Sequence, residues 1–358
     1  MTASMPAAVA AALSRLPPTN RAAHLLTGLE PGAQGQDALL DLAIAVREHE
    51  GELARLRPLA GRVFAGMFFD PSLRTRTSMA VACSKLGAEF LDLNPSSSMW
   101  TLEFGDEVVM DGNAAEHVRE AAGALGQYAD AIGLRAHPTR GKYAQERGQP
   151  IHSAFAAHAG VPVVNLEGPY AHPCQGLADA LTLRDQLGSP QGKRFVLSWA
   201  PHPQQQGLAV PHSALWAASS LGMDVVVAHP VGFELDPEAM AEGERLAAAA
   251  GGSVTVQTDR RGAFDGAEIV YARGWGAVEG AATSAAGHAD AVAGHRDWMV
   301  RQADVGPTAK LMHCLPVRRG VEVSDALLDG PSSIVMKQAG NRVWAQAALL
   351  LTLLGGKT

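Results

Sequence analysis

The stretch RVFAGMFFDPSLRTRTS, residues 62–78, indicates the fold of the chain around it. Residues 62–69 form a nearly continuous apolar run, which is typical of a strand buried on both faces in a parallel sheet. Pro71 ends this run, and the segment that follows, to about Leu86, has the character of a helix. A buried strand that leads through a short turn into a helix is the repeating unit of α/β proteins.

The same alternation of strand and helix continues along the chain. Strands are expected at residues 90–93, 131–135, 161–166, 195–199, 224–228, 254–256, 269–271, 311–314 and 334–336, and helices at 36–56, 116–128, 176–187, 213–221, 237–250 and 341–354. This order predicts an α/β fold with two doubly wound parallel-sheet domains. We expect the domains at residues 1–170 and 171–338, with residues 339–358 as a C-terminal helix packing back on the first domain. The Ala- and Gly-rich residues 276–294 predict a surface loop.

Composition limits the classes of function that the chain can have. Its 358 residues exceed the usual size of one hydrophobic core, and 47% hydrophobic with 18% charged residues is typical of globular proteins. The net charge of −7 gives no support to nucleic-acid binding, and polar residues interrupt every long apolar run. Three widely spaced cysteines favour a reducing compartment over a disulfide framework. We therefore expect a cytoplasmic protein with no nucleic-acid or membrane partner.

The residues after the first strand predict an anion site. In Ser72–Ser78, hydroxyl and guanidinium groups fall on the first turn of a helix, where free backbone N–H groups and the helix dipole attract negative charge. Arg74 adds charge-assisted hydrogen bonds that suit phosphate, while Ser72 and Thr75 add short donors. No Walker or dinucleotide glycine motif is present, so the anion need not be a nucleotide, and we expect no cofactor.

Further polar groups are expected at the carboxyl ends of the strands, where α/β proteins bind ligands. Arg135 ends one strand, His172 and Gln175 stand at a helix start, and His313 opens the segment that ends a strand of the second domain. His172 can donate to a carbonyl oxygen, and the Gln175 amide can bond an NH2 group. These groups recognise phosphate, carbonyl and amine without a metal. We expect no metal site at the scattered histidines His202, His212 and His229, which lack partners at ligand spacing.

Three motifs occur in a characteristic order: Ser72-x-Arg74-Thr75-Arg76, His172-Pro173-x-Gln175 and His313-Cys314-Leu315-Pro316. In this respect the chain, from about residue 36 to the C-terminus, resembles the carbamoyltransferase family. The resemblance implies transfer of the carbamoyl group of carbamoyl phosphate to an amine, in an active site in the cleft between two domains. It also implies a homotrimer, in which the loop carrying Trp100 completes the site of a neighbouring subunit.

The resemblance implies a role for each matching residue. Carbamoyl phosphate would be bound by Ser72, Leu73, Arg74, Thr75, Trp100, Arg135, His172, Gln175, Leu315 and Arg342. Among these, Thr75, Arg135 and His172 would polarise the carbamoyl oxygen. Gln175, Arg342 and the backbone carbonyl groups near Leu315 would hold the carbamoyl NH2. The catalytic residues would be Arg135, His172, Gln175 and Cys314, with the Cys314 thiol orienting the amine during direct transfer.

Several stretches resemble the branch of the family that acts on N-acylated ornithine. Residues 100–104 and 109–112 carry this likeness, whereas residues 271–277 lack the Ser-Met-Gly element with which ordinary ornithine enzymes bind the free amino acid. The products would then be N-acyl-L-citrulline and phosphate, in arginine biosynthesis. The acyl-ornithine would be bound by Ala115, Glu167, Arg273, Cys314, Leu315 and Arg318.

Position 115 bears on the identity of the acyl group. Acetyl-specific relatives carry Glu at this place and succinyl-specific relatives carry Pro, whereas this chain has Ala115. An alanine does not repel the extra carboxylate of a succinyl group, so the sequence favours N-succinylornithine over N-acetylornithine. Two alternatives stay open: an ordinary ornithine carbamoyltransferase, and an inactive anion-binding protein that keeps the fold.

Overall fold

A computed structural model describes residues 4–16, 24–136 and 143–355, which form two compact units. The first unit comprises Met1–His137, Glu146–Leu177 and Arg342–Thr358, and the second comprises Pro138–Gln145 and Ala178–Asn341. The divisions fall inside two helices, α9 (Pro173–Leu187) and α14 (Val335–Leu354), whereas the sequence placed them near residues 170 and 338.

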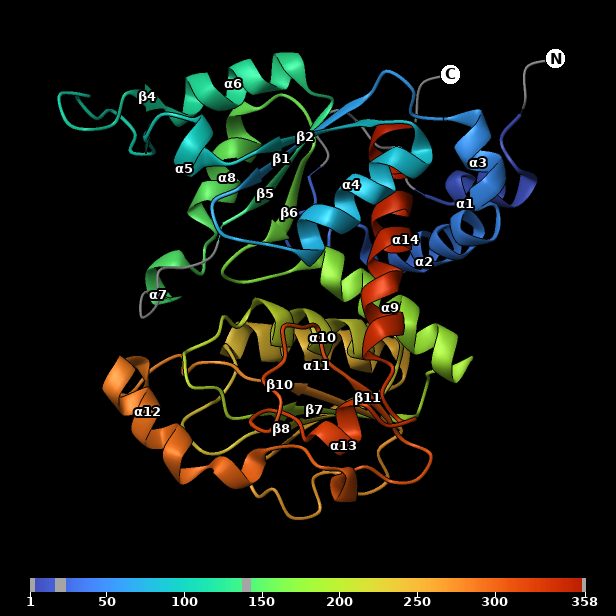
Figure 1. The fold of residues 1–358 in the computed structure, drawn as a ribbon, viewed down its shortest axis with the longest axis vertical. Coiled ribbons are helices and arrows are strands. Elements are labelled where there is room, and N and C mark those ends of the chain that lie inside the picture. Colours follow the sequence, from blue (N-terminus) through green and yellow to red (C-terminus); the bar gives the residue numbers. More distant parts are fainter. Residues whose placement is uncertain (1–3, 17–23, 137–142, 356–358) are drawn as a thin grey trace. The chain divides into compact units, whose positions relative to one another are not determined.

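The first unit is built on a parallel sheet with the strand order β2-β1-β5-β6 (Figure 1). Its strands are β1 (Val63–Phe68), β2 (Glu89–Leu93), β5 (Ala131–Arg135) and β6 (Val163–Glu167). Parallel strands need crossover connections, and these contain α4 (Arg74–Leu86), α6 (Val118–Tyr128) and α8 (Pro150–His158). Shorter or peripheral helices of this unit are α1 (Ala7–Ser14), α2 (Gly32–Glu48), α3 (Glu50–Leu56) and α5 (Pro95–Ser98), whereas α7 (Tyr143–Glu146) belongs mostly to the second unit.

Apolar side chains from the strands and covering helices form the core of the first unit. Met67, Val118, Ile132, Leu134, Phe155 and Val163 are each at most 1% exposed and belong to one cluster. At Gly133 in β5, a Cβ atom would lie 2.6 Å from the Phe64 ring and 2.8 Å from Leu166. Because real Cβ atoms do not approach so closely, only glycine lets these side chains meet over the strand.

The second unit contains a parallel sheet with the strand order β11-β10-β7-β8-β9. Its strands are β7 (Arg194–Trp199), β8 (Asp224–Ala228), β9 (Ser253–Gln257), β10 (Ile269–Arg273) and β11 (Lys310–Met312). Helices α10 (Ala209–Ser220) and α11 (Pro237–Ala250) lie against the sheet (Figure 1). The remaining elements are η1 (Ala281–Thr283), α12 (Ala285–Gly294), η2 (Arg296–Trp298), η3 (Gln302–Asp304) and α13 (Asp325–Leu328). The predicted α/β class with parallel sheets in two units is thus confirmed.

Three sequence expectations differ from the structure. Residues 36–56 form two helices, because His49 leaves the helical conformation with φ −107° and ψ 24°. The strand expected at residues 334–336 is wrong, since α14 already begins at Val335 and only Ser333 pairs with the sheet, in an isolated bridge. The loop expected at residues 276–294 contains η1 and α12.

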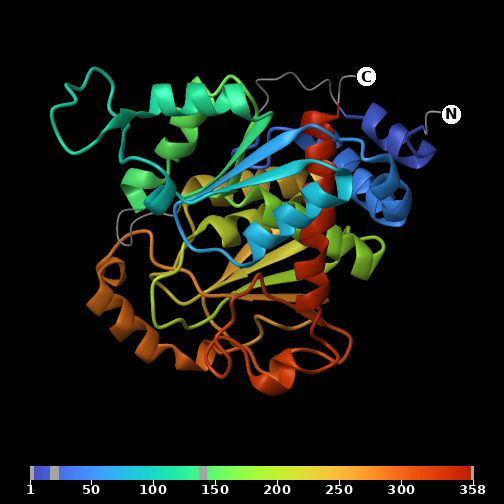
Figure 2. The same ribbon diagram turned by 45° about the horizontal axis from the view of Figure 1, so that its top comes forward.

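Between β2 and α6 the first unit carries a long excursion that stands away from its sheet (Figure 2). Its two legs are joined by β3 (Leu102–Glu103) and β4 (Glu116–His117), which pair in parallel. Just before β4, the Ala115 N–H donates to the Thr101 carbonyl at 3.1 Å. This bond places Ala115 beside the leg that carries Trp100, so both residues belong to one substructure.

Candidate active site

The start of α4 has the chemistry of an anion site. The Ser72 hydroxyl accepts a hydrogen bond from the Thr75 N–H at 3.2 Å. The backbone N–H groups of the first turn of a helix point outward and can donate to a bound anion. The Leu73 side chain is 72% exposed. Arg76 takes no part in this site, because its guanidinium lies over the Phe68 ring and donates to the Asp92 carboxylate at 2.8 Å.

Arg135, Glu167 and His172 meet at the carboxyl ends of β5 and β6. Arg135 and Glu167 end their strands as register partners, and the Arg135 guanidinium forms an ion pair with the Glu167 carboxylate. The same Glu167 oxygen lies 3.4 Å from Nε2 of His172, whose side chain is 2% exposed. The acid therefore orients both the guanidinium and the imidazole at this sheet edge.

A second cluster joins three helices of the first unit around Arg342. Its guanidinium, on α14, donates to the Thr75 hydroxyl on α4 at 2.6 Å and to the Gln175 amide oxygen on α9 at 3.1 Å. All three residues are at most 4% exposed. An arginine in this position sets the direction of both partner side chains, because its fork of N–H groups is planar and rigid.

Burial also changes the pKa of the Cys174 thiol, which lies between His172 and Gln175 in the sequence. Desolvation raises the pKa of Cys174 to about 11, although the charge of Arg342 opposes the shift. Cys174 is therefore a neutral thiol near pH 7.

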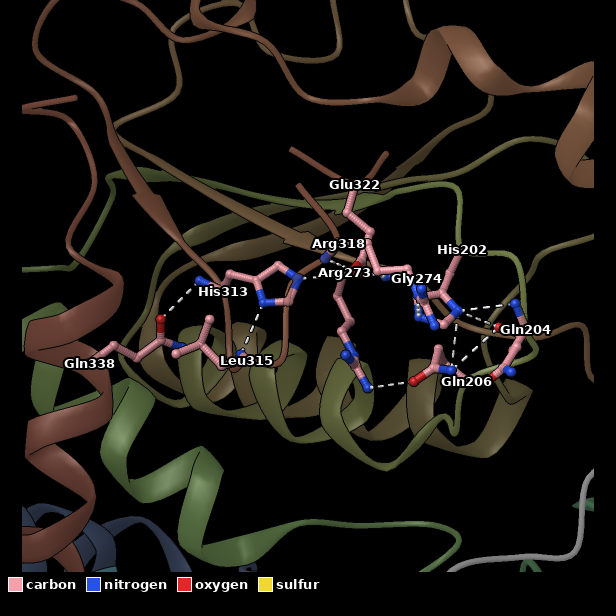
Figure 3. Close-up of polar contacts among 10 residues, drawn as sticks. All are labelled: His202, Gln204, Gln206, Arg273, Gly274, His313, Leu315, Arg318, Glu322 and Gln338. Carbon is pink, nitrogen blue, oxygen red and sulfur yellow. Dashed lines mark hydrogen bonds and ion pairs between the residues drawn. The ribbon is translucent and has the colours of Figure 1, made fainter. Parts of the chain in front are cut away.

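In the second unit, Arg273 and Arg318 are held by polar neighbours (Figure 3). Arg273, at the end of β10, donates to the Gln206 side-chain oxygen at 3.4 Å, and Nε of Arg318 donates to Nε2 of His202 at 3.1 Å. Desolvation lowers the pKa of His202, opposed mainly by the charge of Glu322. The imidazole is therefore neutral near pH 7 and can accept from the guanidinium.

The segment after β11 is fixed by a buried network. The Leu315 N–H donates to Nδ1 of His313 at 2.9 Å, and Nε2 of His313 lies 3.4 Å from the Glu322 carboxylate. The Gln338 side chain accepts from the His313 N–H at 2.9 Å and donates to Asp179 at 2.7 Å. Cys314, a free cysteine of this segment, is 6% exposed.

The structure thus gathers the predicted residues into separate groups. In the first unit it brings Thr75 to Arg342 and Gln175, and Arg135 to Glu167 and His172. In the second unit, Leu315, Arg273 and Arg318 lie on neighbouring segments (Figure 3), and Cys314 directly precedes Leu315 in the sequence. Glu167, expected to bind the acceptor, forms an ion pair with Arg135. Trp100 is 71% exposed on the excursion.

Sequence reasoning missed several polar residues of the second unit. His202 was assigned an ordinary structural role, and Gln206, Glu322 and Gln338 were not considered. The local sequence around Glu322 gives a weak signal, namely a carboxylate between two valines, Val321 and Val323. This alternation predicts that one side of the segment is buried, but it does not predict a buried Glu322. Its partners are distant in sequence, so no short motif reveals it.

Two general features of the described residues bear on function. Within residues 4–16, 24–136 and 143–355, no helix is both long and apolar enough to cross a bilayer. Across the same part of the chain, no group of three or more His, Cys, Asp or Glu side chains is arranged to hold a metal ion.

Comparison with known families connects this geometry to a reaction. Residues 23–185 match the carbamoyl-P binding domain of aspartate/ornithine carbamoyltransferase, and residues 207–353 match the Asp/Orn binding domain of the same enzymes. The chain belongs to the aspartate/ornithine carbamoyltransferase family. The start of α4 and Gln175 therefore fall within the match to the carbamoyl-P binding domain of this carbamoyltransferase, whereas Arg342, which contacts Thr75 and Gln175, falls within the match to the Asp/Orn binding domain.

Individual relatives of this carbamoyltransferase come from the branch with acylated acceptors. N-acetylornithine carbamoyltransferase of Xanthomonas campestris is 38% identical over 306 residues, covering 83% of this chain and 88% of the relative. N-succinylornithine carbamoyltransferase of Bacteroides fragilis is 34% identical over 290 residues, covering 80% and 86%. A solved mutant of N-acetyl-L-ornithine transcarbamylase, complexed with carbamyl phosphate and N-succinyl-L-norvaline, aligns with a TM-score of 0.88 and 35% identity, covering 92% of this chain and 99% of that structure.

Proposed function

We propose that this carbamoyltransferase transfers the carbamoyl group of carbamoyl phosphate to the side-chain amine of an N-acyl-L-ornithine, with N-succinyl favoured over N-acetyl. The products are N-acyl-L-citrulline and phosphate, and the step belongs to arginine biosynthesis in the cytoplasm. The observation that carries the proposal is the buried contact of Arg342 with both Thr75 and Gln175. It holds an anion-binding helix start and an amide together, as a carbamoyl phosphate site requires.

The phosphate group binds at the start of α4. Ser72, Thr75 and the Leu73 N–H supply hydrogen bonds there, and Arg74 and Arg135 supply positive charge. The Glu167 carboxylate partly neutralises Arg135 and holds its guanidinium in place. Binding of a doubly charged phosphate beside an already oriented arginine costs less entropy than ordering a free side chain.

The carbamoyl oxygen is polarised by Thr75, Arg135 and His172. As the amine attacks, negative charge develops on this oxygen, and donors that are already in position stabilise it without reorganisation. His172 is oriented by Glu167 for this purpose. Glu167 thus supports the oxyanion donors, and its contact with the acceptor, expected from the resemblance, stays a prediction.

The carbamoyl NH2 group is bound by Gln175 and by the carbonyl groups of Cys314 and Leu315. Arginine has no acceptor atom, so Arg342 does not itself accept from this NH2 group. Arg342 acts by orienting Gln175 and Thr75, which it contacts at 3.1 Å and 2.6 Å. This assignment refines the direct role expected for Arg342.

The second unit binds the acceptor. Its α-carboxylate needs at least one guanidinium, and Arg273 and Arg318 are both held by polar neighbours. The attacking amine must be neutral, although its ordinary pKa is about 10, so desolvation has to lower that pKa. The Cys314 thiol orients the amine, and the departing phosphate accepts the proton that the amine loses.

The acyl group is read at position 115. The resemblance to the family implies that acetyl-specific enzymes carry a glutamate in place of Ala115. The mutant relative bound with N-succinyl-L-norvaline had one glutamate replaced by alanine, which supports a link between loss of a glutamate and acceptance of a succinyl group. Because Ala115 is tied to the leg that carries Trp100, both residues reach the substrate from the neighbouring subunit of a homotrimer.

The test measures citrulline-type product from carbamoyl phosphate with N-succinylornithine, N-acetylornithine and free ornithine as parallel acceptors. We expect the largest kcat/KM for the succinyl compound. Ala115→Glu should reverse the preference towards the acetyl compound by about tenfold or more, through repulsion of the succinyl carboxylate. Turnover of free ornithine alone would refute the acyl branch, and no turnover with any acceptor would favour the inactive anion-binding alternative.

A further inference from the structure

One buried acid of the second unit has no part in the reaction described so far. The Glu322 side chain is completely buried and accepts from the Gly274 N–H at 3.1 Å and from the Arg318 N–H at 2.8 Å. Its third partner is Nε2 of His313, at 3.4 Å. Burial on its own would raise the pKa of Glu322, but the hydrogen bond from His313 and the nearby charge of Arg273 outweigh it and lower the pKa to about 2. The acid is therefore a carboxylate near pH 7.

The three donors belong to segments that are distant in sequence but that all carry candidate acceptor-binding residues. Gly274 directly follows Arg273 at the end of β10, and His313 directly precedes Cys314. The third donor is the backbone of Arg318 itself. Figure 3 shows these segments converging on the Glu322 carboxylate. A single buried group thus links the segments on which the proposed acceptor site rests.

The hydrogen bonds fix the protonation of His313. Its Nδ1 accepts from the Leu315 N–H at 2.9 Å, so Nδ1 carries no proton. Nε2 then carries the proton and donates it to Glu322. Leu315 has a left-handed backbone with φ 58°, which is unfavourable for a leucine and is held here by the bond to His313. The direction of the Leu315 carbonyl follows from this arrangement.

The packing around Gly274 leaves little freedom for these segments. A Cβ atom at Gly274 would lie 2.8 Å from Cβ of His202 and 3.3 Å from the Glu322 carboxylate. His202 in turn accepts from the Arg318 guanidinium. The carboxylate therefore fixes the Arg318 backbone, while His202, packed on the same glycine, fixes the Arg318 side chain.

We propose that Glu322 and His313 form a positioning pair that holds Arg273, Leu315 and Arg318 in the geometry that binds the acceptor. The inference rests on the proposed function, since it assigns the pair to the same acceptor site. A carboxylate suits this place because both of its oxygens only accept. A glutamine would turn its NH2 group towards a donor, either the Arg318 N–H or the N–H groups of Gly274 and His313, and one of these hydrogen bonds would be lost. An aspartate is one methylene shorter and cannot reach all three donors.

The chain offers a matched control for this experiment. Glu268 precedes β10 at its opposite end, and its carboxylate also accepts a backbone N–H, that of Arg194 at 2.6 Å. Glu268→Gln therefore removes a comparable charge next to the opposite end of β10, away from the acceptor residues. Glu322→Gln and Glu322→Asp are the two test variants.

The experiment measures KM for N-succinylornithine and for carbamoyl phosphate, kcat, and thermal unfolding, in the full-length wild type and all three variants. For Glu322→Gln we expect the acceptor KM to rise by about tenfold to about a hundredfold. The carbamoyl phosphate KM should rise by a smaller factor, up to about fivefold, because of the residues that the pair holds only Leu315 also contacts carbamoyl phosphate. Glu322→Asp should show the same split with a smaller rise. Glu268→Gln should lower the unfolding temperature without changing either KM.

The outcomes separate this inference from the proposed function. A wild type that turns over no acceptor refutes the proposed function. An active wild type with an unchanged acceptor KM in Glu322→Gln refutes the positioning role alone. Equal rises in both KM values would show general damage and would also overturn it. If Glu322→Gln does not fold, Glu322→Asp decides by the same criteria.

Discussion

The candidate sites of the two units differ in the groups that hold them in place: side chains in the first unit, and mainly backbone amides bound to one carboxylate in the second. In the first unit, the Glu167 carboxylate balances the charge of Arg135, and the neutral side chains of Thr75 and Gln175 hold Arg342. In the second unit, the carboxylate of Glu322 lies completely buried and holds mainly backbone amides. A site for a small, highly charged anion needs donors aimed by side chains. A site for a larger acceptor needs several loops held in fixed positions relative to one another.

The largest expected effect concerns Arg135 in the first unit. Arg135→Gln removes a donor to both the phosphate and the developing oxyanion, and leaves the Glu167 carboxylate without its ion pair. We expect kcat to fall by about a thousandfold in initial-rate measurements with saturating substrates. The matched control is Arg62→Gln, because Arg62 pairs with Asp130 at 2.7 Å at the other end of the same sheet. An equal loss in both variants would contradict the assignment.

A smaller effect is expected for Arg342→Lys. A lysine ammonium cannot reproduce the planar fork that contacts Thr75 and Gln175 together, so one of the two bonds is lost. We expect kcat/KM for carbamoyl phosphate to fall by about a hundredfold, and the acceptor KM to stay the same. Thr75→Asn provides a comparison, since it keeps an acceptor for Arg342. If only the acceptor KM changed in Arg342→Lys, the assignment of Arg342 to the carbamoyl phosphate site would be wrong.

The smallest effect is a pH dependence of the second unit. Desolvation lowers the pKa of His202, so the folded protein holds the imidazole neutral. The hydrogen bond from Arg318 to this imidazole is therefore fully formed above pH 6.5, the ordinary pKa of histidine. This hydrogen bond is lost as the pH falls through the lowered pKa of His202, because a protonated imidazole cannot accept from Arg318. We expect the acceptor KM to rise below pH 6.5 by a few-fold, about the value of one hydrogen bond.

Two variants test this dependence. His202→Asn should flatten the acidic rise in the acceptor KM, because the titrating group is gone. His229→Asn is the control, since His229 is also buried in the same unit but bonds to the Pro230 carbonyl. An acidic rise that persists in His202→Asn would assign the titration to another group.

The first unit was more predictable from sequence than the second. The strand at residues 131–135 and the helix that follows Pro71 are confirmed, because continuous apolar runs and a proline are strong local signals. The three residues 334–336 look like a strand for the same reason, but a short apolar run does not distinguish a strand from a buried helix start. The Glu322 network has no local pattern, because its donors come from Gly274, His313 and Arg318.

The position of Arg342 in α14 has a consequence for biosynthesis of the protein. Asn341 bonds to Thr182 and Asp185 in the second unit, whereas the next residue, Arg342, bonds to Thr75 and Gln175 in the first. A ribosome translates the sheet of the first unit early but Arg342 only after the whole second unit. Domains usually fold in order of synthesis. Here the nascent first unit lacks the guanidinium that orders Thr75 and Gln175, so its anion site is completed only after the second unit has been translated.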